Sequence, residues 1–310
     1  MILQTSFAKQ IETVITLAGV IDLESSKKFS SVNDLKHGYR ALLQSLGQRD
    51  IRVGATEPSF ITNAEEAKKL RILFSNDSLL DDKTQAAVIN DQQDDEAHEK
   101  EDRLVRALSE LALYSAEHST LFNTVITDIF ALPSNIAKGG STSQAIGVIW
   151  ANPKISYTTP DMIEILIHEL THHAMFLDEL RYTHYSYSRV FNQSTWARSA
   201  ILNVARPLDK VLHSIVVAAE VLLFRDRYLG HPVNPRVHPP TRLMVKQLKD
   251  SISSTEQAIA RDHTVFHPRA TELLENARNI LNDRLIPLLA RLSTSKAGAN
   301  DGQKVLHGIA

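Results

Sequence analysis

Apolar residues recur at intervals of three and four along much of this chain, the spacing that places them on one face of an α-helix. The pattern is clear over residues 11–23, 32–46, 64–74 and 103–119. The acidic run 91–102 offers almost no apolar side chain to bury, so we expect a mobile loop there. The alternative is that these acids form the solvated first turns of the following helix.

The residue composition of the chain changes near Phe122, where β-branched residues become frequent. Segments 122–132 and 145–153 are rich in Val, Ile and Thr, and residues 133–144 between them contain the Pro, Ser, Asn and Gly typical of turns. This pattern predicts two strands. We expect the strand within 147–152 to border a cleft, where its edge could pair with an extended peptide.

Helix signals return at Thr159. Thr159, Pro160 and Asp161 supply an N-cap, a proline at the first helical position and an acid in the first turn. A helix is therefore predicted from there to about Leu180. A second, largely apolar helix opens at Pro207, and two more are expected before a polar C-terminal tail.

Composition narrows the possible functions. The 310 residues carry 34 Lys and Arg against 36 Asp and Glu, a net charge of −2, which argues against a nucleic-acid-binding surface. The chain has no cysteine, so disulfides, iron–sulfur clusters, thiolate zinc sites and cysteine nucleophiles are excluded. Its 13 histidines are the one unusual feature, and most of them lie between His168 and His267.

No segment suggests a membrane or an export route. The N-terminus lacks an early basic cluster, and Lys9 and Glu12 interrupt its apolar residues. No apolar run approaches the roughly 20 residues needed to cross a bilayer. We therefore expect a soluble cytoplasmic protein that contacts no membrane.

The most informative segment contains His168, Glu169 and His172, an H-E-x-x-H motif on the helix predicted from Thr159. Residues four apart on a helix project from the same face, so the two imidazoles can bind one metal ion. Residues 162–167 are mostly apolar, which suggests that the helix is buried, and buried imidazoles need partners. A transition-metal site on His168 and His172 is therefore predicted, with an exposed polar patch as the alternative.

Three residues compete to be the third ligand. His213 lies on the second apolar helix, Glu220 follows it by one heptad on the same face, and Asp178 lies ten residues after His168. The Asp178 spacing is that of metallopeptidases whose third ligand follows a glycine turn, but Met175 occupies the turn position here. We favour His213, and Glu220 and Asp178 stay open. No ligand role is predicted for the other histidines of the region, several of which lie beside prolines or on polar faces: His173, His184, His231, His238, His263 and His267.

After the motif helix, the chain continues with Arg206-Pro207-Leu208 and then Leu212-His213 at the start of an apolar helix. Over roughly residues 135–230 this arrangement resembles a bacterial family of H-E-x-x-H peptide-modification proteins, which accompany ribosomally made, post-translationally modified peptides. Some members act as 2-oxoglutarate-dependent peptide β-hydroxylases. The resemblance implies Fe(II) and 2-oxoglutarate as cofactors and a precursor peptide as substrate. The chain departs from the family at residues 214–216, which are Ser-Ile-Val where small residues are frequent.

Two chemistries are compatible with these residues. In an oxygenase, Fe(II) bound by His168, His172 and His213 keeps three positions open, and the planar guanidinium of Arg206 would hold the distal carboxylate of 2-oxoglutarate. In a zinc metallopeptidase, the metal lowers the pKa of a bound water and Glu169 takes its proton as general base. We favour the hydroxylase, with the peptidase as the alternative. A structural metal in a peptide-binding module is a third possibility, although structural zinc sites usually have four protein ligands, often thiolates.

These observations predict an α+β, mainly helical fold in which the H-E-x-x-H helix packs on a small β-sheet, as in zincin-like proteins. Residues 1–120 are expected to form a helical N-terminal region, and residues 121–292 the metal-binding catalytic region with the C-terminal helices. Residues 293–310 are expected to be a flexible tail.

Overall fold

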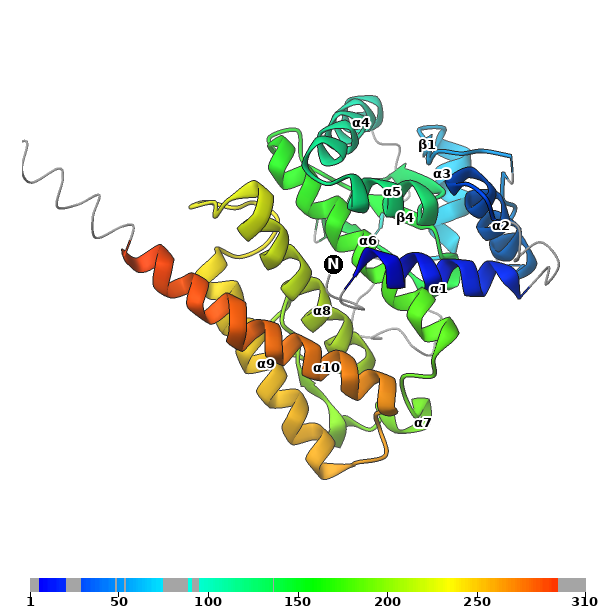
Figure 1. Ribbon diagram of the computed structural model, residues 1–310. Coiled ribbons are helices and arrows are strands. Elements are labelled where there is room, and N and C mark those ends of the chain that lie inside the picture. Colours follow the sequence, from blue (N-terminus) through cyan, green and yellow to red (C-terminus); the bar gives the residue numbers. More distant parts are fainter. Residues whose placement is uncertain are drawn as a thin grey trace, which may run out of the picture.

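The described part of the protein is mainly helical and carries a four-stranded β-sheet and a two-stranded one, as expected for an α+β fold (Figure 1). The computed structural model describes residues 6–20, 29–47, 49–52, 54–74, 89–90, 95–135 and 137–294. Its helices are α1 (Phe7–Gly19), α2 (Val32–Ser45), α3 (Ala64–Ile72), α4 (Ala97–Tyr114), α5 (Ala116–Val125), α6 (Thr159–Arg181), α7 (Tyr187–Val190), α8 (Leu208–Phe224), α9 (Thr241–Arg261) and α10 (Pro268–Ile280). Its strands are β1 (Ser59–Ile61), β2 (Asp128–Ala131), β3 (Gly139–Gly140), β4 (Val148–Ala151), β5 (Ala197–Arg198) and β6 (Ala205–Arg206).

The sheet has the strand order β1-β2-β4-β3, with β1, β2 and β4 parallel and β3 antiparallel to β4. Successive side chains face opposite sides, as the pleat requires. Ile129 and Ile149 join the main core, to which α4, α5 and α6 contribute, whereas Phe130 and Trp150 join a smaller core with residues of α3. Both faces of the central strands are therefore covered, which explains their continuous apolar sequence.

The strand within 147–152 borders the cavity as expected, because Trp150 of β4 lines it, but the expectation of a free edge was wrong. β3 covers that edge of β4 through the pairs Gly139↔Ala151 and Gly140↔Trp150, so β3 is the edge strand of the sheet. Glycine has low β propensity, and a two-glycine strand therefore depends on the partner that β4 offers. The sequence pattern could not reveal it.

Two other boundaries also differ from the prediction. Residues 122–125 belong to α5, and the strand begins at Asp128, because burial of Phe122 and Val125 in the core outweighs the β propensity of the segment. Helix α4 begins at Ala97, within the acidic run 91–102. The second half of this run therefore forms the first turns of a helix rather than a loop. Residues 91–94 and most of the predicted tail, 295–310, lie outside the described residues.

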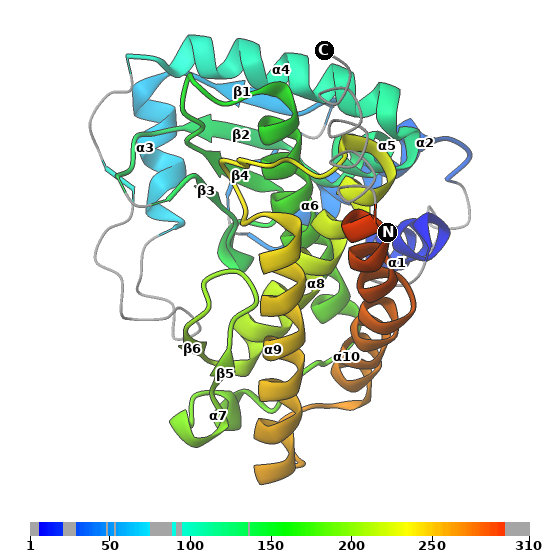
Figure 2. The ribbon, with the colours of Figure 1, turned by 90° about the vertical axis from the view of Figure 1, so that its left-hand side faces the viewer.

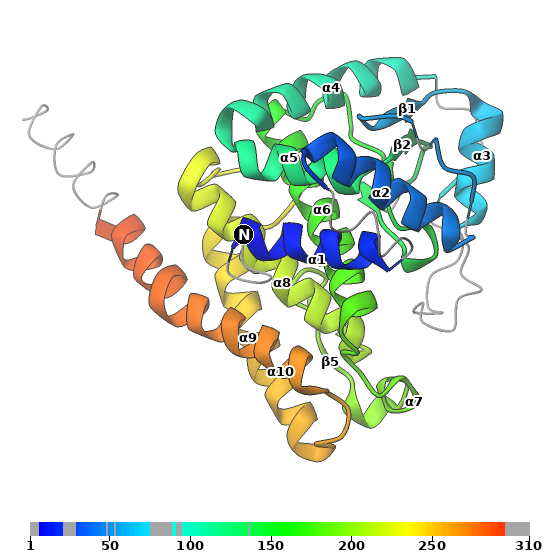
Figure 3. The same cartoon turned by 45° about the vertical axis from the view of Figure 1, so that its right-hand side comes forward.

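Helix α6 is the element that connects the sheet with the C-terminal helices. It contacts α1, α4, α5, α8 and β3. Figure 2 shows the sheet with α3 and α4 towards one end of α6 and helices α8 to α10 towards the other, and Figure 3 shows α1 crossing α6. The helix begins one residue earlier than predicted, since Thr158 is the N-cap and forms a capping box with Asp161.

The C-terminal helices α8, α9 and α10 pack on one another. The hairpin of β5 and β6 precedes α8, and a π-helical turn, Arg225–Leu229, follows α8. The hairpin is attached to α8 where the backbone N–H of Ala200 donates to the hydroxyl of Ser214 at 2.9 Å. This attachment fixes the hairpin beside the first turns of α8.

The described helices differ from membrane spans. None of them combines the length and the apolar character that crossing a bilayer requires.

Candidate metal centre

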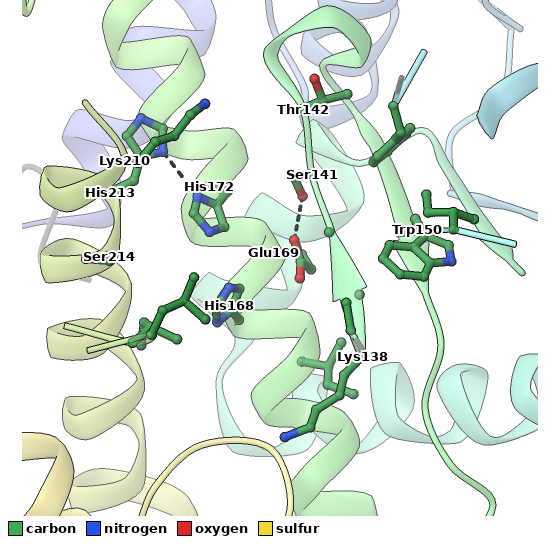
Figure 4. A pocket seen from close by; sticks show the side chains of 18 of the residues that line it. Lys138, Ser141, Thr142, Trp150, His168, Glu169, His172, Lys210, His213 and Ser214 are labelled. Carbon is green, nitrogen blue, oxygen red and sulfur yellow. Dashed lines mark hydrogen bonds between the residues drawn. The ribbon is translucent and has the colours of Figure 1, made fainter. Parts of the chain in front are cut away.

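The two histidines of the H-E-x-x-H motif lie on one face of α6, as their spacing predicts. The rings of His168 and His172 have centroids 4.9 Å apart, and both line a cavity of about 820 Å³ (Figure 4). Glu169 projects towards β3, where it accepts a hydrogen bond from the hydroxyl of Ser141 at 2.7 Å. The motif therefore presents two imidazoles and a carboxyl group to one cavity.

The cavity lies where the sheet meets the C-terminal helices. Residues of α6, of β3 and β4, of α8 with the β5–β6 hairpin, and of the end of α3 line it. Gly139 permits close packing here, because a Cβ at this position would lie 3.0 Å from the carbonyl oxygen of Trp150 and 3.2 Å from Oε1 of Glu169. The glycine thus lets the carboxyl group of Glu169 approach the edge strand.

His168 begins a buried chain of polar contacts. Its Nδ1 lies 2.8 Å from Nε2 of His238, and Nδ1 of His238 lies 3.0 Å from Oε2 of Glu164. Arg225 donates two hydrogen bonds to the same carboxylate, at 2.5 and 2.8 Å. Burial raises the pKa of Glu164, but the hydrogen bonds from His238 and Arg225 more than offset this effect, and the pKa is lowered overall. Glu164 is therefore an ionised, acceptor-only group.

His172 begins a similar chain. Its Nδ1 lies 3.1 Å from Nδ1 of His213, and Nε2 of His213 lies 2.6 Å from Oε1 of Glu179. The two imidazole rings have centroids 5.4 Å apart. The structure thus brings His213 from α8 to the motif, as the sequence predicts, and supports it with a carboxylate from α6.

Burial sets the protonation of the motif. Together with nearby histidines, it holds the pKa values of His168 and His172 well below their usual range, so both imidazoles are neutral and each can offer a lone pair to a metal. Burial also raises the pKa of Glu169 to about 8, against the lowering effect of the hydrogen bond from Ser141. Glu169 can therefore hold or release a proton near neutral pH.

The other two candidates for the third ligand lie elsewhere. Asp178 accepts hydrogen bonds from Arg269 at 2.8 and 3.0 Å and contacts His184 at 2.7 Å, because α6 continues straight through this position. Glu220 lies about two turns beyond His213 on α8, where it contacts His118 at 3.0 Å. Neither side chain lines the cavity, so His213 is the remaining candidate for the predicted third ligand.

Cationic side chains also line the cavity. Arg206 ends the β5–β6 hairpin and Lys210 lies in the first turn of α8. Lys138 lies on the β3 side, where its Nζ donates to the carbonyl of Val237 at 2.8 Å. Glu169 is the one carboxylic acid among the described residues that line the cavity. The cavity is consequently suited to an anionic ligand.

The metal itself stays a prediction. Across the described part of the chain, no three His, Asp or Glu side chains are gathered closely enough to hold one ion. The donor chemistry nevertheless fits, because His168 and His172 are neutral and use Nδ1, not Nε2, for their contacts with His238 and His213. The predicted ligands His168 and His172 therefore lie on one wall of the cavity, each with its Nε2 available. The predicted third ligand, His213, contacts His172.

Several residues of the site were missed in the sequence, among them His238, Ser141 and Glu179. His238 is 70 residues from His168 and lies in a proline-rich connection, where no helical spacing links it to the motif. Ser141 lies in a turn whose composition predicts only a loop. The concentration of histidines between His168 and His267 was the one signal that could have suggested a further partner.

No protein-family model and no curated protein matches the chain.

Proposed function

We propose that this chain is a metal-dependent enzyme that hydroxylates a ribosomally made precursor peptide at a β-carbon, using Fe(II) and 2-oxoglutarate. The composition of the cavity carries this proposal. Histidines gather at the motif, while Glu220 and Asp178, the carboxylates that a peptidase could use as a third ligand, are engaged elsewhere. Cationic side chains, which suit a dicarboxylate, occur in the same cavity.

His168 and His172 are the first two metal ligands in this proposal, and His213 is the third. Imidazoles bind Fe(II) as well as zinc, and a three-residue set leaves positions open for other ligands. Bound Fe(II) and 2-oxoglutarate would supply the oxidising chemistry that amino-acid side chains lack. Because Nε2 of His213 contacts Glu179 at 2.6 Å, His213 would bind the metal through Nδ1, which would exchange its present contact with Nδ1 of His172 for the ion. Glu179 would then orient His213 in the way carboxylates commonly support metal-binding histidines.

Arg206 is the proposed partner of the distal carboxylate of 2-oxoglutarate. A guanidinium can donate two parallel hydrogen bonds to a carboxylate and remains charged at all relevant pH values. Lys210 lines the same cavity, so it would add a second positive charge. The chain would in this way both orient the co-substrate and offset its charge.

The edge strand β3 supports a peptide as the substrate. Only β4 pairs with β3 within the described sheet, so an extended peptide could add to its outer edge through main-chain hydrogen bonds. The glycines at positions 139 and 140 place no side chain in the way. Because Glu169 lies beside Gly139, a peptide on this edge would pass close to the motif.

A zinc metallopeptidase is the second candidate, and Glu169 is the observation that favours it. Its pKa of about 8 and its contact with Ser141 suit a group that takes and returns a proton. In a peptidase Glu169 would act as general base towards water, whereas in a hydroxylase it would position its neighbours.

Succinate formation distinguishes the two enzymes. The protein is loaded anaerobically with Fe(II) and then exposed to oxygen with and without 2-oxoglutarate. We expect succinate only when metal, oxygen and 2-oxoglutarate are all present. Arg206→Ala should raise the 2-oxoglutarate concentration for half-maximal turnover roughly 10- to 100-fold, because hydrogen bonds to charged groups contribute about 1.5–3 kcal/mol.

Arg198→Ala is the matched control. Arg198 lies on the other strand of the same hairpin, contacts Asn203 at 3.1 Å and does not line the cavity, so its loss should leave the 2-oxoglutarate requirement unchanged. Absence of succinate under every condition, together with tight zinc binding and peptide cleavage that Glu169→Gln abolishes, would assign the protein to the peptidases instead.

A further inference from the structure

Both ring nitrogens of His238 contact other ionisable side chains. Nδ1 lies 3.0 Å from Oε2 of Glu164, and Nε2 lies 2.8 Å from Nδ1 of His168. His173 shows the contrasting case of a histidine built into the core, since its nitrogens contact the main chain at Gly147 and Val148. His238 instead connects a buried ion pair with the motif.

The positions of the ring hydrogens on His238 and His168 follow from the ion pair at the far end of this series of contacts. Glu164 is held by two hydrogen bonds from Arg225, and an ionised carboxylate can only accept, so Nδ1 of His238 must carry a hydrogen. Arg225 already balances the charge of Glu164, and a second positive charge on the buried His238 would have no counter-charge of its own. His238 is therefore neutral and its Nε2 is an acceptor.

The same reasoning extends to His168. If Nε2 of His238 accepts, Nδ1 of His168 must be the donor across the 2.8 Å contact. A neutral imidazole carries one hydrogen, so Nε2 of His168 is left with a free lone pair. This is the tautomer that a histidine needs to bind a metal through Nε2.

We propose that His238 is a positioning residue, which holds His168 in the tautomer and ring orientation required for metal binding through Nε2, with Glu164 and Arg225 as its support. The role inferred for His238 in metal binding rests on the proposed metal site. The tautomer itself is a property of the metal-free protein, and it can be measured there.

The first measurement is long-range ¹H–¹⁵N correlation NMR on metal-free protein labelled with ¹⁵N-histidine, with the His168 signals assigned from His168→Gln. We expect wild-type His168 to carry its hydrogen on Nδ1. His238→Ala should shift His168 towards the Nε2–H tautomer or a mixture. His238→Gln should restore the wild-type tautomer, because the carbonyl oxygen of glutamine can accept the same hydrogen bond. A His168 with its hydrogen on Nε2 in the wild type overturns the proposal, whatever the variants do.

The second measurement is Co(II) affinity and the visible spectrum of the Co(II) protein. His238→Ala should bind Co(II) about 10- to 100-fold more weakly, the usual loss when a group supporting a metal ligand is removed, and its spectrum should change. His238→Gln should recover most of the affinity. Equal affinity and an unchanged spectrum in His238→Ala would contradict the inference.

His231→Ala is the matched control, because His231 lies in the same connection but contacts Thr241 at 3.2 Å and does not line the cavity. It should keep the wild-type tautomer of His168 and the wild-type Co(II) affinity. A wild-type protein that binds no Co(II) would defeat the proposed metal site, whereas the NMR result would still decide the role of His238. The two failures are therefore distinguishable.

Discussion

Two clusters of the same chemical composition occur on helix α6. In each, a buried carboxylate of α6 accepts two hydrogen bonds from an arginine and contacts a histidine. Near the motif the three residues are Glu164, Arg225 and His238. Near the end of the helix they are Asp178, Arg269 and His184.

The clusters differ in what the second nitrogen of the histidine does. Nε2 of His238 contacts His168 at 2.8 Å in the cavity. Nδ1 of His184 is buried without a hydrogen bond, 3.9 Å from Glu179, and His184 does not line the cavity. Composition alone therefore does not identify a functional cluster. The connection of the histidine to the cavity distinguishes the two.

The largest expected difference is in metal binding. Purified His168→Ala should lose most of its bound metal, because one of the two ligands on α6 is removed, whereas His184→Ala should retain it. Elemental analysis of both variants after loading with Zn(II) or Fe(II) measures this directly. Equal metal content in His168→Ala and the wild type would end the distinction between the two clusters.

Stability should respond at both clusters, and more strongly near the motif. Removing one member of a buried ion pair typically costs about 3–5 kcal/mol, because the partner charge is left unpaired. Arg225 is 0% exposed and Arg269 is 13% exposed, so Glu164→Gln should approach the upper end and Asp178→Asn about 3 kcal/mol. Urea unfolding of both variants tests the order, and a larger loss in Asp178→Asn would reverse it.

A smaller effect is expected in the acid dependence of stability. Burial raises the pKa of Asp178, but hydrogen bonds from His184 and Arg269 outweigh burial, so the pKa is lowered in the folded protein. The stabilisation is then complete above the unfolded value of about 3.9 and is lost as the pH falls below it towards the folded pKa. The stability advantage of the wild type over Asp178→Asn should therefore shrink below about pH 4.

The control for this pH series is Asp250→Asn, which removes an exposed carboxylate whose contact is Lys246 at 3.4 Å. Its difference from the wild type should stay small at every pH. An advantage over Asp178→Asn that stays constant from pH 6 to pH 3 would show that the carboxylate of Asp178 is not stabilised by its partners.

Periodicity predicted the parts of the site that lie on single helices. The spacing of His168 and His172 places both on one face, and the capping residues before Asp161 locate the start of α6 to within one residue. His213 was found because it opens an apolar helix. Glu220 shares the helix face of His213, but the cavity extends along only the first turns of α8, and sequence spacing carries no information on where a cavity ends.

Contacts between distant segments could not be predicted in this way. His238 and Glu164 meet only after the chain has folded back over α8, and β3 exists because β4 supplies its partner edge. The strand predicted over 122–132 is present only as Asp128–Ala131 for a related reason, since the β-branched composition did not reveal that Phe122 is buried in a helix. Tertiary packing decided each of these cases.

The prolines beside His238 restrict its backbone and so reduce the conformational entropy that this segment loses on folding. A residue that precedes a proline is restricted to extended backbone conformations, and Pro239 follows His238 directly, with Pro240 capping α9. The carbonyl of Pro239 accepts a hydrogen bond from Arg225 at 2.8 Å, and that of Val237 accepts one from Lys138 at 2.8 Å. The unfolded segment thus has fewer conformations to lose, and the imidazole is carried on a backbone already restricted before folding.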